Sequence, residues 1–314
     1  MFKCSLCGAG FNRRDNLKRH LMGAEGLSEQ EAEKLLPNPK QAERKQSPKI
    51  AKLQDKKVSS KRVIRLNRVY LEPNGKGYAE LVPLGDIHYG HPACDVDRAT
   101  RMRDYCLEKG VYVLGMGDYI EAGLRTSVGD SVYQQELNPD NQTEWAEEFF
   151  APLAERGLLI GLLLGNHEGR ILKETSINVV RWMAKQLQVP YLGYACWNLL
   201  YVGNQSYSVY ALHGSTGSRY VYTKLKALVD ISHNFDADLL MMGHVHELDE
   251  NAILVQRVDR SSKTIKERKK YLLLTGSYLQ YDDSYAQEKG YPMGKLGSPK
   301  VKLFSDKHDI HLST

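Results

Sequence analysis

From residue 63 onward, short apolar runs alternate with longer amphipathic stretches. Five apolar runs end in glycine beside a polar residue: AELVPLG (79–85), VYVLGMG (111–117), LLIGLLLG (158–165), SVYALHG (208–214) and DLLMMGH (238–244). Between several of them, helical patterns are expected at residues 95–109, 143–156, 171–188 and 219–233. Continuous apolar strands that are covered by helices indicate an α/β domain with buried sheets.

The first 62 residues follow a different pattern and predict two further parts. Residues 1–26 form a small module with closely spaced cysteines, and residues 27–62 form a short helix followed by a basic linker. Ser28 and Glu31 predict a capping box for that helix. Its continuation to Arg62 is rich in Lys, Gln, Ser and Pro, which is typical of flexible or disordered chain. Residues 63–314 are then the main domain.

The charge is concentrated at the N-terminus. Residues 1–62 hold 15 Lys and Arg against 7 Asp and Glu, a net charge of +8, so the formal total of +5 leaves −3 for the remainder. A second basic run, residues 257–270, has seven basic and two acidic residues and is interpreted as a solvated hairpin. A polyanionic partner is therefore expected to meet the N-terminal fifth of the chain.

Cysteine usage and hydropathy bound the compartment. The chain has no apolar run near the ~20 residues of a membrane span, and Lys3 and Cys4 stand where a signal peptide needs an apolar core. Of five cysteines, only Cys4 and Cys7 are closely spaced, which favours a reducing compartment. We expect a soluble intracellular protein of the cytoplasm, nucleoid or nucleus, with no membrane partner.

The chemistry stands where the predicted strands end, which is where open α/β sheets bind ligands. Five blocks carry it: GDIH (85–88), GDYIE (117–121), GNHE (165–168), LHG (212–214) and GHVH (243–246). Within two of these blocks the potential ligands are two residues apart, a spacing that puts both side chains on one face of an extended chain. The set supplies oxygen and imidazole donors suited to Zn, Mn or Fe. Its members are Asp86, His88, Asp118, Asn166, His213, His244 and His246.

These five blocks, in this order, resemble the calcineurin-like metallophosphoesterase superfamily over about residues 78–280. The resemblance implies a four-layer αββα sandwich of two mixed sheets, and an enzyme with two divalent ions (Mn, Fe or Zn). It implies that the first ion is held by Asp86, His88, Asp118 and His246. Asp118 would bridge to the second ion, which is completed by Asn166, His213 and His244.

Hydrolysis through a metal-bound hydroxide follows from the charges of such a site. Two ions bring +4 and the carboxylates Asp86 and Asp118 bring −2, which leaves +2 for a phosphate anion and a hydroxide. Two ions also lower the pKa of bound water toward ~7. The resemblance further implies that His167 donates a proton to the leaving oxygen and that Glu121 orients His167. In an extended chain His167 should point away from Asn166.

The residues beside these blocks favour a phosphodiester substrate. GDYIEAG is close to the GDYVDRG of serine/threonine protein phosphatases, but Ala122 and Leu164 stand where those enzymes carry phosphate-gripping arginines. The loop 122–142 is either a substrate lid, with Arg125 as a phosphate contact, or an ordinary solvated loop. Arg219 is a second weak candidate, because HGSTGSR (213–219) either approaches the metals or only caps the next helix.

The N-terminal module resembles a two-cysteine, two-histidine zinc finger with a ββα fold. Phe2, Cys4, Cys7, Phe11, Leu17 and His20 fit that pattern, but the second histidine is missing. Glu25 is the residue that could replace it. Arg13, Asn16 and Arg19 occupy the positions that reach bases in such fingers. The module is either a zinc-bound finger or a degenerate basic helix.

Three functions are compatible with these patterns. The leading hypothesis is a dinuclear metal-dependent phosphodiesterase or nuclease that acts on nucleic acid, with DNA as the expected partner and the N-terminal module as a tether. The second keeps the chemistry but takes a phosphoprotein or small phosphate ester. The third is a catalytically inert DNA-binding accessory protein; such relatives typically lose metal ligands, whereas this chain keeps all seven.

Overall fold

The structure of the protein is a computed structural model, and its two compact units, Met1–Ser47 and Pro48–Thr314, are considered separately. It describes residues 2–7, 10–11, 14–36, 56–58, 62–64, 66–127, 133, 135–215, 220–282, 284, 287, 290 and 292–314. No helix within these ranges is both long and apolar enough to cross a bilayer.

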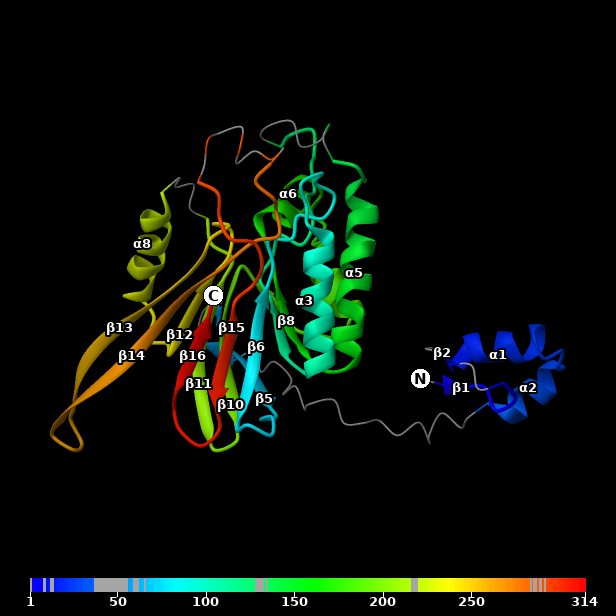
Figure 1. Cartoon of the computed structure of the whole chain (residues 1–314), viewed down its shortest axis with the longest axis horizontal. Coiled ribbons are helices and arrows are strands. Elements are labelled where there is room, and N and C mark those ends of the chain that lie inside the picture. The colour runs from blue at the N-terminus through cyan, green and yellow to red at the C-terminus, as the bar shows by residue number, and fades with distance from the viewer. Residues whose placement is uncertain are drawn as a thin grey trace. The chain divides into compact units, whose positions relative to one another are not determined.

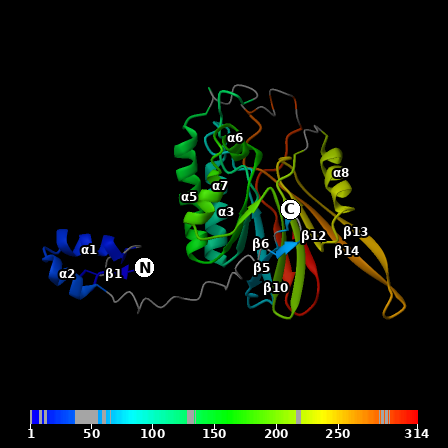
Figure 2. The same ribbon diagram turned by 180° about the vertical axis from the view of Figure 1, so that it is seen from behind.

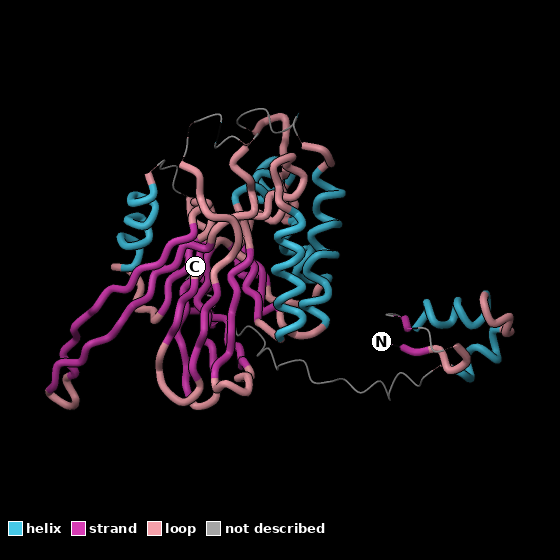
Figure 3. The backbone as a smooth tube through the Cα atoms, in the orientation of Figure 1, coloured by secondary structure: helices cyan, strands magenta, loops and turns pink. Residues whose placement is uncertain are grey.

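The second unit is built on two six-stranded mixed sheets (Figures 1 and 3). The first has the order β13–β14–β12–β11–β10–β5. Its strands are β5 (Leu66–Leu71), β10 (Ala195–Val202), β11 (Gln205–Leu212), β12 (Leu239–Met242), β13 (Leu248–Asp259) and β14 (Thr264–Thr275). β11, β12 and β14 are parallel, and β10 pairs antiparallel with β11 and parallel with β5.

The second sheet has the order β16–β15–β6–β7–β8–β9. Its strands are β6 (Tyr78–Leu84), β7 (Tyr112–Gly115), β8 (Leu159–Leu163), β9 (Tyr191–Gly193), β15 (Lys300–Phe304) and β16 (Ile310–Ser313). β6 to β9 run parallel, whereas β15 and β16 add an antiparallel edge. A short hairpin, β3 (Lys56–Val58) and β4 (Arg62–Ile64), precedes both sheets.

Helices cover the outer faces, which gives the four layers expected of an αββα sandwich. The helices of this unit are α3 (Val96–Lys109), α5 (Pro139–Glu155), α6 (Asn166–Thr175), α7 (Val179–Gln186) and α8 (Val221–Ser232). Figures 1 and 2 show α3, α5 and α7 beside the second sheet and α8 beside the first. The predicted fold class is confirmed.

Strand periodicity separates the layers, because successive side chains point to opposite faces of a sheet. On β12, Leu239 and Met241 belong to the large core between the sheets, whereas Leu240 and Met242 pack in a second cluster with Leu228 of α8. All four strand residues are buried, so this strand reads as one continuous apolar run.

The predicted elements agree closely with the observed ones, with one exception. The five apolar runs form β6, β7, β8, β11 and β12, and three of the four helical stretches form α3, α5 and α8. The stretch predicted at 171–188 is two helices, α6 and α7. The chain turns at Ser176, whose φ is +61°, and Asn178 caps α7 by accepting from the Arg181 N–H at 2.8 Å.

The basic run 257–270 lies in the long hairpin of β13 and β14, as interpreted from the sequence. Two of its residues are tied to the end of α8 and the segment that follows it. Arg268 binds Asp236 at 2.7 Å and Asp238 at 2.9 Å, and Lys270 donates to the carbonyl oxygens of Ser232 and Phe235 at 2.8 Å each. These contacts hold the inner part of β14, whereas most of the run is exposed.

The first unit contains β1 (Phe2–Lys3), β2 (Gly10–Phe11), α1 (Arg14–Gly23) and α2 (Glu29–Leu35). The predicted capping box is confirmed, since the Glu31 carboxylate accepts from the Ser28 N–H at 3.0 Å. Helix α2, which the sequence placed in the linker, packs on α1. The buried cluster that joins them consists of Cys4, Leu17, Leu21, Ala32 and Leu36. The boundary predicted at residue 26 therefore falls inside one packed unit.

Candidate metal centre

The five candidate blocks lie at or just after the ends of β6, β7, β8, β11 and β12, and the GNHE block continues into α6. β6, β7 and β8 are parallel, as are β11 and β12, so within each sheet the carboxyl ends meet at one edge. This is the upper edge of the molecule in Figure 1, where α6 begins. The fold thus brings together residues that are up to 160 positions apart, from Asp86 to His246.

Two glycines allow these loops to touch. A Cβ at Gly165 would lie 2.1 Å from both the backbone N and Oδ1 of Asp118. Gly117 has a φ of +91°, and a Cβ there would lie 2.7 Å from the backbone of Gly165 and 2.8 Å from Nδ1 of His213. The glycines at these strand ends are therefore required by close approach and not only by a turn.

The backbone conformation that brings the ligand pairs together differs from the extended one that was predicted. Five of the seven candidates are non-glycine residues with positive φ: Asp86 (+48°), His88 (+56°), Asp118 (+51°), His244 (+67°) and His246 (+51°). The extended-chain reasoning is wrong here, because these residues lie beyond the strand ends in left-handed backbone. Such strain persists where surrounding structure holds it, and it clusters at functional sites.

The first group of side chains is Asp86, His88 and His246. Nε2 of His88 and Nε2 of His246 are 3.0 Å apart, and Nε2 of His246 is 3.5 Å from Oδ1 of Asp86. The Asp86 carboxylate also accepts from the His244 backbone N–H at 3.0 Å, which ties the loops after β6 and β12 together. One imidazole, one carboxylate and a second imidazole thus face a common point.

The second group is Asp118, Asn166, His213 and His244. Nε2 of His213 is 2.9 Å from Oδ1 of Asn166 and 3.1 Å from Oδ2 of Asp118. Nδ1 of His213 is 2.8 Å from the Met116 carbonyl oxygen, so it donates its proton there and leaves Nε2 directed into the group. The rings of His213 and His244 are 5.3 Å apart.

Asp118 lies between the two groups and has an oxygen suited to a cation. Its Oδ1 accepts from the His167 backbone N–H at 2.9 Å, at the start of α6. Its Oδ2 is buried and, within the described part of the chain, accepts no hydrogen bond. This oxygen is 3.1 Å from Nε2 of His213 and 3.9 Å from Nε2 of both His88 and His167. The donors and this orphaned oxygen fit two divalent ions that share Asp118.

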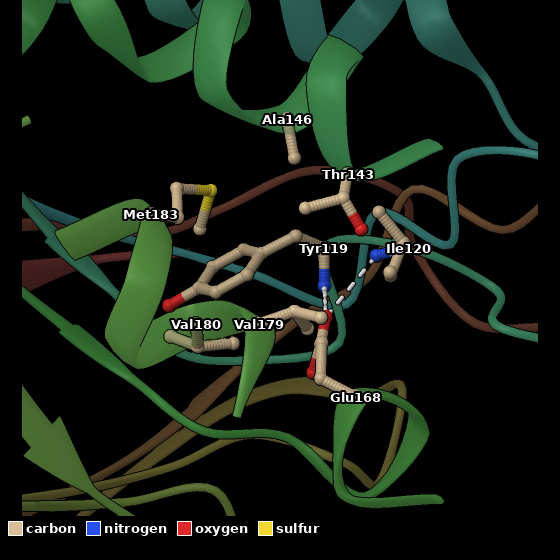
Figure 4. A pocket seen from close by; sticks show the side chains of 8 residues that line it. All are labelled: Tyr119, Ile120, Thr143, Ala146, Glu168, Val179, Val180 and Met183. Atoms are coloured by element: carbon tan, nitrogen blue, oxygen red, sulfur yellow. Dashed lines mark hydrogen bonds between the residues drawn. The ribbon is translucent and has the colours of Figure 1, made fainter. Parts of the chain in front are cut away.

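The Glu168 carboxylate fixes the backbone of the loop that contains Asp118. Its carboxylate accepts from the backbone N–H groups of Tyr119 at 2.6 Å, Gly165 at 3.1 Å, and Asp118 and Ile120 at 3.2 Å each. Figure 4 shows Glu168, Tyr119 and Ile120 at a small pocket whose other lining residues belong to α5 and α7 and are apolar except for Thr143. Glu168 is therefore a positioning residue for the loop that contains Asp118. The sequence analysis did not single it out.

Glu121 contacts both His88 and His167, but in different ways. Oε2 of its carboxylate is 3.1 Å from Nδ1 of His88 and 3.4 Å from Nδ1 of His167. The closest contact of His167 is instead the Glu121 backbone carbonyl, which accepts from Nδ1 at 2.6 Å. The carboxylate is thus closer to His88 than to His167, the residue that it is expected to orient from the sequence.

His167 is the second residue of α6, so it does not follow the extended geometry that predicted its direction. Its ring packs edge-on against His88, with 4.4 Å between the centroids. Burial lowers the pKa of His167 to about 4. Nη2 of Arg170 donates to Nε2 of His167 at 3.0 Å. Arg170 was missed from the sequence, although positions three and four residues after a helical ligand share its face.

Of the two weakly predicted phosphate contacts, the structure describes only Arg125. Arg125 is exposed, and the base of its loop is closed instead by glutamines. Gln142 accepts from the Ala122 N–H at 2.9 Å and Gln135 accepts from the Gly123 N–H at 2.9 Å. Arg219 lies outside the described residues.

The first unit holds a separate cluster of potential ligands: Cys4, Cys7, His20 and Glu25. Sγ of Cys7 is 3.2 Å from Nε2 of His20, which is 3.3 Å from Oε1 of Glu25. Backbone N–H groups of Cys7 and Leu6 donate to the Cys4 sulfur and lower the pKa of its thiol. Asn16 and Arg19 are exposed on α1, where Nη2 of Arg19 donates to Oδ1 of Asn16 at 2.9 Å. Arg13 lies outside the described residues.

Comparisons with known proteins identify the family. The model of the calcineurin-like phosphoesterase family matches residues 82–248, more than half of the chain. A search of curated proteins found no match.

Three solved structures illustrate what this chain is similar to. A predicted phosphoesterase from Streptococcus pneumoniae is 13% identical, with 75% of this chain and 88% of that chain covered and a TM-score of 0.34. Vps29 from Entamoeba histolytica, complexed with zinc, is 14% identical over 74% and 97%, with a TM-score of 0.31. A metallophosphoesterase from Sphaerobacter thermophilus is 14% identical over 74% and 87%, also with a TM-score of 0.31.

These TM-scores are too low to support an argument about function. The assignment rests on the family match, which spans all five blocks, and on the convergence of their side chains. The chain belongs to the calcineurin-like phosphoesterase family and is a metal-dependent enzyme that hydrolyses phosphoesters.

Proposed function

We propose that this phosphoesterase is a phosphodiesterase that cleaves nucleic acid, with DNA as the favoured substrate. The observation that carries the proposal is the separate N-terminal unit, whose helix α1 exposes Asn16 and Arg19 on one face. Asparagine and arginine are the side chains that pair with adenine and guanine edges. A net charge of +8 over residues 1–62 adds attraction to a polyanion.

The lining of the site supports a diester over a phosphoprotein. Ala122 and Leu164, where protein phosphatases carry arginines, are both fully buried, so neither position presents a polar group to substrate. A diester carries one negative charge where a monoester carries up to two, and therefore needs fewer cations around it. The second candidate, a phosphoprotein or small-molecule phosphatase, would use the same metal centre but would need more positive charge around the substrate phosphate.

Asp86, His88, Asp118 and His246 would hold one divalent ion, and Asp118, Asn166, His213 and His244 the other. Two such ions polarise a phosphoryl group and activate water. The chain's own residues orient these ligands: Glu121 accepts from Nδ1 of His88, and the Met116 carbonyl accepts from Nδ1 of His213. Oxygen and imidazole donors suit Mn, Fe or Zn alike, and we favour Mn.

His167 is the residue we assign to proton transfer at the leaving oxygen. Its Nδ1 proton is fixed on the Glu121 carbonyl, so Nε2, which accepts from Nη2 of Arg170 at 3.0 Å, is the atom that we assign to the substrate. That atom is 3.9 Å from Oδ2 of Asp118, which places it beside the proposed metals. A proton held or released at Nε2 therefore lies next to the reacting phosphate.

In the first unit, we propose that Cys4, Cys7, His20 and Glu25 bind one structural zinc ion. Two thiolates, one imidazole and one carboxylate are ligands that zinc accepts in tetrahedral sites. The ion would fix α1 against β1 and β2, while α2 packs on α1 through Ala32 and Leu36. The unit then acts as a tether that holds nucleic acid near the enzyme.

The proposal is tested with the Mn²⁺-loaded protein on labelled single- and double-stranded DNA, RNA, bis(p-nitrophenyl) phosphate and p-nitrophenyl phosphate. Cleavage of DNA and of the chromogenic diester, with weak action on the monoester, is expected. A variant that lacks residues 1–47 should keep diester hydrolysis, because every proposed ligand of the two catalytic ions lies after Gly85. Its DNA affinity should fall and depend less on salt. Preference for the monoester, or no nucleic-acid cleavage, would refute the proposed substrate.

A further inference from the structure

Arg170 occupies the face of α6 that carries the metal-site residues. It follows Asn166 by four residues and His167 by three, and helical residues at these spacings are neighbours. Its side chain is 27% exposed, so the guanidinium is partly accessible while its neighbours His167 and Glu121 are buried. Arg170 is therefore a candidate for a functional role at the site.

Within the described part of the chain, the contacts of Arg170 use only part of its donor capacity. Nη2 donates to Nε2 of His167 at 3.0 Å, and Nη1 donates to the Glu121 carbonyl oxygen at 3.4 Å. The Glu121 carboxylate oxygen Oε1 is 3.9 Å from Nη1. A guanidinium has five N–H groups in one plane, and these two hydrogen bonds engage two of them. Among the described residues, the guanidinium is therefore held in the site with donors left for a ligand.

Arg170 supplies a positive charge to a site whose loops lack other phosphate-binding arginines at two positions. Protein phosphatases of this superfamily grip phosphate with arginines at the positions of Ala122 and Leu164, and both of these residues are apolar and fully buried. Arg170, whose side chain is 27% exposed, contacts His167, the residue that we assign to the leaving oxygen. Arginine binds phosphate oxygens through paired N–H groups better than lysine does.

We infer that Arg170 binds a nonbridging oxygen of the substrate phosphate, and so replaces from α6 the arginine grip that the loops after β7 and β8 lack. On binding, the guanidinium exchanges its contact with Nε2 of His167 for the phosphate, which frees Nε2 to face the leaving oxygen. The inference rests on the phosphoester chemistry of this site and is independent of nucleic acid being the substrate.

Binding of inorganic phosphate to the full-length Mn²⁺-loaded protein, measured by calorimetry, tests this without turnover. Arg170→Ala should raise the Kd of phosphate ~10- to 100-fold, the range for a lost hydrogen-bonded charge. Arg170→Lys should raise it less, because the charge stays but the planar fork is lost. Lys173→Ala removes an equal charge from an exposed position one turn further along the same helix and should leave the Kd unchanged. Metal content and melting temperature should be unaltered in all three variants.

An unchanged phosphate Kd in Arg170→Ala overturns the inference. So does a loss of kcat without a change in Kd, because that pattern assigns Arg170 to the positioning of His167 alone. If phosphate binding depends on Arg170 while the protein cleaves no nucleic acid, the inference stands and the proposed substrate is wrong.

Discussion

Replacing Glu121 with alanine should weaken metal binding more than it weakens catalysis at saturating metal. The carboxylate is 6% exposed and is the acceptor for Nδ1 of His88, at 3.1 Å. Without it, the His88 ring loses the hydrogen bond that fixes Nε2 toward Asp86 and His246. A hydrogen bond to a charged group contributes ~1.5–3 kcal/mol, and acceptors behind metal-binding histidines typically change affinity ~10–100-fold.

The assay is a competition between the protein and a chelating dye for Mn²⁺, followed by diester hydrolysis at saturating Mn²⁺. Glu121→Ala should lower the affinity of one of two sites ~10–100-fold, and excess Mn²⁺ should restore most of the activity. Glu121→Gln, which keeps a neutral acceptor, should lose less. Glu144→Ala on α5 removes an exposed carboxylate remote from these contacts and serves as the matched control.

The opposite outcome would assign Glu121 to His167. If metal affinity is unchanged while kcat falls at saturating Mn²⁺, the 3.4 Å contact between the carboxylate and Nδ1 of His167 matters more than the 3.1 Å contact with His88. That result would return Glu121 to the role first expected from the sequence.

Three further predictions concern single features. His167→Ala should retain both metals yet lower kcat ~10²–10⁴-fold, and a metal content below that of the unmodified protein would show that His167 is a ligand. Gly165→Ala should lose bound metal by elemental analysis, because its Cβ would lie 2.1 Å from Asp118; full metal content would contradict the packing argument. Burial raises the thiol pKa of Cys94 and Cys106 to about 12, so at pH 8 iodoacetamide should label the exposed Cys7 instead, and zinc should block that labelling. Equal labelling with and without zinc would refute the proposed zinc site.

Much of the site was predictable from residue types at strand ends. A strand that ends in glycine beside a ligand is a local pattern, and parallel strands bring such ends to one edge whatever the loop conformation. The backbone that aims the side chains was not predictable in the same way. Asp86 and His88 have left-handed φ values that are held by contacts with distant loops, such as the bond from the His244 N–H to Asp86.

Contacts that depend on tertiary packing escaped the sequence for the same reason. The pairing of Glu121 with His88 joins residues from two different loops, and no spacing rule links them. Helix α2 reads as an isolated capped segment until Ala32 and Leu36 are seen buried against α1. Arg170 was different, because its spacing from Asn166 and His167 carried the signal once α6 was known to begin at Asn166.

The central claim is that two divalent ions share Asp118 and are required for hydrolysis. The most direct measurement is a titration of metal-free protein with Mn²⁺, with bound metal and hydrolysis of bis(p-nitrophenyl) phosphate followed together, in parallel with Asp118→Asn. The account predicts that activity rises to a plateau at two ions per chain, and that Asp118→Asn loses bound metal and activity together. Full activity in metal-free protein, or an Asp118→Asn variant with unchanged stoichiometry and rate, would contradict it.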